Sequence, residues 1–139
     1  MLIVLDTNVL VSGLLTPFGS PARVVDQVVS ADLQVAFDDR ILFEYADVLT
    51  RPRFDFPKNQ VEVLVDHIKL NGVQVSARPL DPRDLPDPSD LPFAEVAVTA
   101  RADFLVTGNA PHFSFLSDHG VRVVSPSDFI AAIERLAGS

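Results

Sequence analysis

Four acidic residues from separate segments are the part of this sequence whose types and spacing best fit a chemical site. Asp6 directly follows an apolar run, Glu44 lies in a helical pattern, and Asp87 and Asp90 precede another helix. Carboxylates crowded at one place repel one another, which raises some of their pKa values unless a divalent cation neutralises them. A hard cation such as Mg²⁺ prefers oxygen ligands and can activate a bound water. The chemistry indicated is therefore hydrolysis of a phosphodiester.

The elements that must bring these residues together follow from alternating apolar runs and helical patterns. Short apolar runs predict buried strands at residues 2–5, 33–37, 73–75, 104–107 and 121–124. Apolar residues spaced i, i+3 or i+4 predict helices at residues 24–29, 41–49, 61–68, 92–101 and from 126 to the C-terminus. This alternation favours the α/β class, as a three-layer α/β/α sandwich with a parallel sheet of roughly five strands. A length of 139 residues fits a single domain over residues 1–139.

Local signals mark where several of the helices begin. Ser20 and Ser125 each precede a proline, which predicts a hydroxyl at the N-cap and proline at the first helical position. Residues 79–92 combine five prolines with four aspartates, a composition typical of an extended, exposed loop. That loop is expected to lead into the next helix.

The predicted sheet places the candidate residues at one edge. Asp6 follows the first strand and Asn109 follows the strand at 104–107, so both are expected at the carboxyl ends of parallel strands, where sites form in open sheets. Glu44 lies at the border of the apolar stripe of its helix and is expected to lean inward. The acidic segment 87–90 lies at the N-terminus of the helix before the 104–107 strand. Four segments therefore offer oxygen ligands toward one rim.

Each of these residues taken singly also has a purely structural explanation. Asp6 can cap a helical turn that follows it, and Asp90 can cap the next helix. Glu44 can pair with Arg40 four residues earlier, and Asn109 fits simple turn chemistry. The convergence of the four segments, rather than any one residue, favours the metal site.

The charge of the chain limits what it binds. A net charge of −8 argues against broad electrostatic binding of nucleic acid, unless divalent cations supply the positive charge that faces a phosphate. Arg51, Arg53 and Lys58 form the one local basic cluster and are candidates for contacts with a substrate backbone. Arg83 and Arg101 are further candidates near the acidic rim.

Composition also bears on compartment and on the metal ligands. The chain has no cysteine, so a metal must be held by oxygen or imidazole, and a reducing compartment is expected. Polar residues interrupt the longest apolar stretches, which predicts neither a signal peptide nor a membrane span. A cytoplasmic protein is the expectation.

Four motifs, in order, resemble those of the PIN-domain family. They are LDTNVL at residues 5–10, EYADVL followed by RPRF within residues 44–54, DPSD at residues 87–90 and ADFLVTGN at residues 102–109. The order and spacing match from about residue 2 to residue 126, nearly the whole chain. More narrowly, the chain is similar to the toxin components of toxin–antitoxin systems related to the VapC-type toxins.

The resemblance implies a ribonuclease that depends on Mg²⁺ or Mn²⁺. Asp6, Glu44 and Asp90 match the family's three central acids, and Asp87 is expected to add to the metal ligands from the preceding loop. Asn109 stands where many members carry a fourth acid, an aspartate, and it completes the implied catalytic set. Its amide brings a carbonyl oxygen but no charge.

Supporting roles are implied for residues beside these acids. Thr7, Asn8 and Thr107 match positions that typically orient the acids or the scissile phosphate. His112 stands where another acid is often found and is a candidate at the edge of the site. The basic cluster at residues 51–58 supplies the candidates for RNA contacts.

The partners implied by the resemblance are an RNA substrate, a cognate antitoxin protein that occludes the acidic groove, and a second copy of the chain bound through apolar helix faces. The alternative is a PIN-like module with weakened catalysis that acts through partner binding or dimerisation. Asn109, His112 and the net charge of −8 favour that alternative. The retained acids favour catalysis, because a carboxylate cluster without a metal lowers stability.

Overall fold

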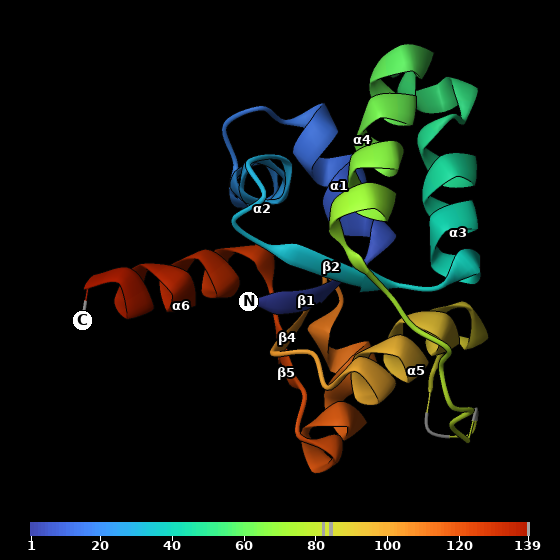
Figure 1. Ribbon diagram of the computed structural model, residues 1–139, viewed down its shortest axis with the longest axis vertical. Coiled ribbons are helices and arrows are strands. Elements are labelled where there is room, and N and C mark those ends of the chain that lie inside the picture. Colours follow the sequence, from blue (N-terminus) through green and yellow to red (C-terminus); the bar gives the residue numbers. More distant parts are fainter. Residues whose placement is uncertain (82, 84, 139) are drawn as a thin grey trace.

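The predicted strands pair into one five-stranded sheet in the order β3-β2-β1-β4-β5, with every pairing parallel (Figure 1). The computed structural model describes residues 1–81, 83 and 85–138 of the chain. The strands are β1 (Leu2–Leu5), β2 (Gln34–Phe37), β3 (Val73–Gln74), β4 (Phe104–Val106) and β5 (Arg122–Val124). Each lies within the apolar run that predicts it, because strands covered on both faces consist mainly of apolar residues.

Helices cover both faces of the sheet. The helices are α1 (Thr7–Leu15), α2 (Ser20–Val29), α3 (Asp39–Leu49), α4 (Lys58–Asn71), α5 (Leu91–Ala100) and α6 (Pro126–Gly138). The chain also forms the short 3-10 segments η1 (Pro52–Phe54) and η3 (Pro88–Asp90) and the longer 3-10 segment η4 (Ala110–His119). Figure 1 shows α1 to α4 on one side of the sheet and α5 with η4 on the other, while α6 packs against α2 and β4. The three-layer α/β/α prediction is confirmed.

The strand order creates a switch point beside β1. The chain runs from β1 to β2 and β3 on one side and then crosses to β4 and β5 on the other. In open parallel sheets, ligands bind in the crevice at the carboxyl ends of the strands at such a point. Leu5 pairs in register with Val106, so the residues that directly follow β1 and β4 leave the sheet side by side.

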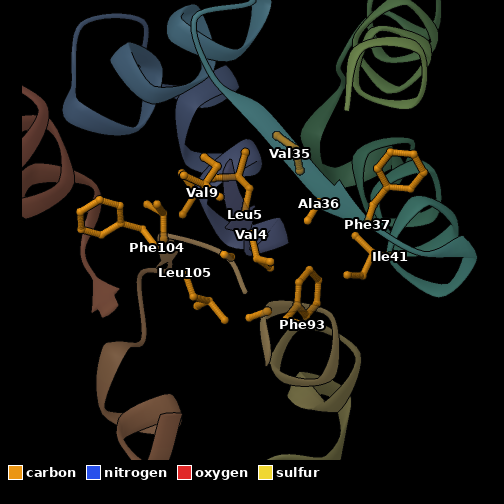
Figure 2. Packing of buried hydrophobic residues seen from close by; sticks show 14 of the residues in the cluster. Val4, Leu5, Val9, Val35, Ala36, Phe37, Ile41, Phe93, Phe104 and Leu105 are labelled. Atoms are coloured by element: carbon orange, nitrogen blue, oxygen red, sulfur yellow. The ribbon is translucent and has the colours of Figure 1, made fainter. Parts of the chain in front are cut away.

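Apolar side chains fill the space on both sides of the central strands (Figure 2). Val4 of β1 faces Phe93 of α5, whereas Leu5 lies toward Val9 of α1, as the alternation of side chains along a strand requires. Leu85 is also buried, so the loop at residues 79–92 is anchored to the core and not wholly exposed as expected. Pro82 and Asp84 of that loop lie outside the described residues.

Helix α1 is the main element that the sequence reading reduced to a single turn. Its residues are apolar on more than one side, so they lack the one-sided pattern of a surface helix. Gly13 explains how α1 lies so close to α2. A Cβ at this position would come within 2.8 Å of Val25 Cγ2 and 2.9 Å of the Pro21 carbonyl oxygen.

The two predicted serine caps have different outcomes. Ser125 is confirmed, because its hydroxyl accepts a hydrogen bond from the Asp128 N–H at 3.1 Å. The Ser20 prediction is wrong: the N-cap of α2 is Gly19 without a side-chain cap, since the helix begins one residue earlier and Ser20 already lies inside it. None of the helices that the structure describes is both long and apolar enough to span a membrane.

Candidate active site

Asp6 and Thr107 meet at the switch point of the sheet. Asp6 occupies the N-cap position of α1, but its carboxylate makes no capping hydrogen bond. Its Oδ2 instead accepts a hydrogen bond of 2.7 Å from the hydroxyl of Thr107, which directly follows β4 and is fully buried. The carboxylate of Asp6 is therefore held toward β4, and the local capping explanation does not describe what it does.

Helix α3 brings Glu44 to the same edge. The buried hydroxyl of Tyr45 donates to the carbonyl oxygen of Leu5, which ties α3 to the end of β1. The adjacent Glu44 accepts a hydrogen bond from the hydroxyl of Thr7, the residue after Asp6. Burial raises the pKa of the Tyr45 hydroxyl well above its ordinary value, and the charges of the nearby acids raise it further, so it stays a donor.

Arg40 does not pair with Glu44, although the helical spacing allowed it. Its guanidinium bonds Asp38 at 2.7 Å and Glu95 at 2.8 Å. Glu95 is buried in α5 and also accepts from the Leu80 N–H at 2.7 Å. Sequence reasoning missed this ion pair and its buried carboxylate; a charge inside the otherwise apolar 93–97 stretch was the available signal.

The loop before α5 supplies two carboxylates in different states. Asp87 accepts from the Ser89 N–H at 2.9 Å, a hydrogen bond that holds its pKa below the ordinary value. Asp90 takes the N-cap position of α5 without a capping hydrogen bond. Its Oδ2 is buried without a hydrogen-bond partner and lies 3.4 Å from Nδ1 of His112, in η4.

The charges of these acids act on one another. Burial raises the pKa of Asp6 from 3.8 to about 6 against the lowering effect of the Thr107 hydrogen bond, and the charges of Asp90 and Glu44 raise it further. Burial also raises the pKa of Asp90, and the charge of Asp87 adds to the effect. Asp6, Glu44 and Asp90, from three segments, therefore share one electrostatic environment.

The loop after β4 is tied to this cluster. The side-chain oxygen of Asn8 accepts from the Gly108 N–H at 3.1 Å. The Asn109 N–H donates to the Thr107 hydroxyl at 3.0 Å, so that hydroxyl accepts from one side and donates to Asp6 on the other. The structure places Asn109 next to the cluster with its side chain exposed.

The donor set fits a hard divalent cation, although the acids do not form a closed cage. Within the described ranges, no group of three or more His, Asp or Glu side chains is placed to hold a metal ion together. Mg²⁺ commonly takes one or two carboxylates directly and keeps several waters, so it does not need such a cage. A cation would offset two features of the cluster: the buried Asp90 oxygen that lacks a hydrogen bond and the raised pKa of Asp6.

A groove of about 450 Å³ leads away from this cluster. Thr7, Asn8 and Glu44 are among the residues on its lining, and so are Arg51 and Arg53 of the basic cluster. The two arginines from the basic cluster thus share a groove with a candidate metal ligand. Phe54 lines it as well, although sequence reasoning counted only the charges of the RPRF motif.

The three basic side chains of residues 51–58 have different neighbours. The guanidinium of Arg53 lies 4.7 Å from the ring centroid of Phe54, which in turn stacks on Phe56 at 5.4 Å. Arg51 pairs with Asp47 at 3.3 Å. Lys58 lines a different pocket, beside Phe43 and Glu62. The three members of the predicted basic cluster therefore do not act on one surface.

Arg101 does not join the acidic rim as expected. Arg101 precedes β4, at the amino end of the strand, whereas Asp6 and Thr107 lie at the carboxyl ends. Arg83 bonds the neighbouring Asp81 at 2.6 Å. Sequence proximity to the acidic loop misled the prediction for Arg101, because α5 carries the chain to the opposite end of the sheet.

Comparison with known proteins adds one match. A family model described as PIN domain matches residues 2–110, which include all four candidate acids and Asn109. His112 lies just beyond the matched residues. A search of curated proteins finds no match to the chain.

Proposed function

The chain belongs to the PIN domain family, whose members are generally nucleases, and from that premise we propose that it is a metal-dependent endoribonuclease and the toxin of a type II toxin–antitoxin pair. The observation that carries the proposal is the state of two of the three central acids, Asp6 and Asp90. Asp6 has a pKa raised to about 6, and Asp90 has a buried oxygen without a hydrogen-bond partner. Both features fit carboxylates that act with a divalent cation.

Each residue near the cluster has a distinct part in the proposed reaction. Asp6, Glu44 and Asp90, with Asp87 beside them, would hold Mg²⁺ or Mn²⁺, which supplies an activated water and offsets charge on the phosphate. Thr107 orients Asp6, and Thr7 orients Glu44, through the hydrogen bonds described above. These bonds restrict the orientations of the Asp6 and Glu44 carboxylates before a substrate arrives.

The proposed path of the RNA follows the groove between Glu44 and the arginines. Arg53 is held against Phe54, so its guanidinium is already ordered and can contact a backbone phosphate at a low cost in entropy. Arg51 is partly engaged by Asp47 and contributes less. Lys58 lines another pocket, and we assign it a contact only with a strand that extends past the groove.

Calorimetric titration of Mn²⁺ and Mg²⁺ tests the proposal when single-stranded RNA cleavage is followed in the same buffers. We compare wild type with Asp6→Asn, and with Asp66→Asn as a control that removes an exposed charge from α4. Metal binding and cleavage that are lost only in Asp6→Asn support the nuclease. The absence of metal binding by wild type would contradict it.

A second candidate function is a partner-binding module with weakened catalysis, and an exposed apolar face favours it. Phe18 is 94% exposed and Val63 is 69% exposed, and both belong to the α1, α2 and α4 side of the molecule. Leu14, Val25 and Val63 line a pocket of about 310 Å³ there. Apolar surface of this kind marks protein interaction sites.

The same face supports a homodimer and an antitoxin as the proposed partners. Light scattering of wild type beside Val63→Glu tests the dimer, since a charge on this face should shift the mass toward that of a monomer. Wild type that binds metal without cleaving RNA, yet dimerises through this face, favours the module over the nuclease.

A further inference from the structure

A second pocket, of about 540 Å³, lies away from the acidic cluster and carries the opposite charge. It is formed by the last turn of α5, the chain after β3 and the end of η4. Its lining includes Arg78, Arg101 and His119. Because Arg101 stands before β4 while Asp6 follows β1, roughly 10 Å of sheet separates the two sites along the strands.

The two arginines of this pocket have no carboxylate partner among the described residues. Arg23, Arg40 and Arg51 all form ion pairs elsewhere in the molecule, whereas Arg78 and Arg101 form none with residues 1–81, 83 and 85–138. No acidic side chain is among the described lining residues of the pocket. In a chain with a net charge of −8, this is a local concentration of positive charge with no acidic neighbour among the lining residues that the structure describes.

The pocket is held in shape from two sides. The Arg78 N–H donates to the Thr99 hydroxyl at 2.9 Å, and the Leu80 N–H donates to the buried Glu95 at 2.7 Å. These bonds fix the chain after β3 against α5. The Thr99 hydroxyl accepts in this arrangement, so its own hydrogen is left to donate to a ligand.

The backbone at Arg101 is unusual for an arginine. The residue is the C-cap of α5 and has a left-handed conformation, with φ 52° and ψ 48°. Glycine adopts this conformation without strain and is the usual residue at such a helix end. A strained position that carries a functional group is a reason to look for a function. The alternative is that the positive charge only offsets the dipole of α5.

We propose that this pocket binds a phosphate group carried by an organic molecule of nucleotide size. The guanidiniums of Arg78 and Arg101 hold the phosphate oxygens, the hydroxyl of Thr99 donates to one of them, and the apolar lining of Leu80 and Val98 receives the attached organic group. The volume falls in the range of small-molecule sites, about 300–1,000 Å³. The phosphate can belong to a free mononucleotide or to the end of an RNA strand. The proposal does not depend on the nuclease function.

Calorimetry in EDTA tests the proposed phosphate site, with adenosine monophosphate as the first probe and a short 5′-phosphorylated DNA oligonucleotide as the second. Wild type should bind at least one probe, and Arg78→Gln and Arg101→Gln should each weaken that binding by at least about tenfold. Arg135→Gln, which removes an exposed charge from α6, should leave binding unchanged. Binding of the mononucleotide identifies a free ligand as the source, and binding of the oligonucleotide alone identifies the end of a strand.

Arg101→Gly distinguishes ligand binding from the alternative that the charge of Arg101 only offsets the dipole of α5. Glycine relieves the left-handed strain, so the variant should keep or raise its melting temperature while it loses the probe by the same factor as Arg101→Gln. Three results would overturn the proposal: no binding of either probe by wild type, an equal loss in Arg135→Gln, or retained binding in Arg101→Gly.

Discussion

Replacing Asp6 by asparagine should stabilise the metal-free protein at neutral pH. Burial raises the pKa of the Asp6 carboxyl from 3.8 to about 6, so the folded state binds this proton more tightly than the unfolded chain does. The stabilising effect of the proton is complete below pH 3.8 and is lost as the pH rises through about 6. A difference of about 2 pKa units between the folded and unfolded states means that ionised Asp6 destabilises the folded state by about 3 kcal/mol.

Asparagine has the shape of aspartate, does not titrate and can still accept from the Thr107 hydroxyl through its amide oxygen. That hydrogen bond is weaker to an amide than to a carboxylate, so we expect a net gain of about 1–3 kcal/mol in the free energy of unfolding above pH 7. The gain should shrink as the pH falls from 7 toward 4, because Asp6 in the wild type then becomes protonated.

Urea unfolding in EDTA at pH 4, 6 and 8 measures this difference, with Asp66→Asn as the control for a general loss of negative charge. Added Mg²⁺ should then raise the stability of wild type by mass action and leave Asp6→Asn unchanged. A variant that is less stable than wild type at pH 8, or a gain that does not depend on pH, would refute the reasoning.

Three further substitutions test separate parts of the structure. Tyr45→Phe leaves the buried Leu5 carbonyl without its donor and should lower the free energy of unfolding by about 1–3 kcal/mol in urea, with a loss of metal affinity as α3 loosens. Arg53→Ala should weaken RNA binding in a filter assay without changing the metal titration, because Arg53 lines the groove. Lys58→Ala should weaken RNA binding less, since Lys58 lines another pocket. Equal effects of the two substitutions would contradict the proposed path of the RNA along the groove. Gly13→Ala should lower the free energy of unfolding by about 1–3 kcal/mol, because the added Cβ would lie 2.8 Å from a side chain of α2. An unchanged melting temperature would argue against that close approach.

Two features of the structure were not predicted correctly from the sequence: helix α1 and the position of Arg101. Helix α1 shows only a weak amphipathic period, because apolar residues occupy most of its circumference and only Asn8 and Ser12 give it a polar side. Arg101 was expected beside the acidic loop, yet α5 carries it to the other end of the sheet, where it lines the cationic pocket. In both cases the tertiary packing, which the local sequence pattern does not encode, decides how the segment is buried or where it lies.

The strands, five of the six α-helices and the α/β class follow from the sequence alone, because burial imposes an apolar run on each strand and a helical period on each of these helices independently of the others. The sequence also determined that Asp6 follows a strand and that Asp90 begins a helix. Tertiary structure alone decided the order of the strands, and with it the bond between Thr107 and Asp6. It likewise decided that Arg40 pairs with Glu95 rather than Glu44, and that an oxygen of Asp90 is buried without a hydrogen-bond partner. These are contacts between residues far apart in the chain, and their energies depend on how all the layers pack together.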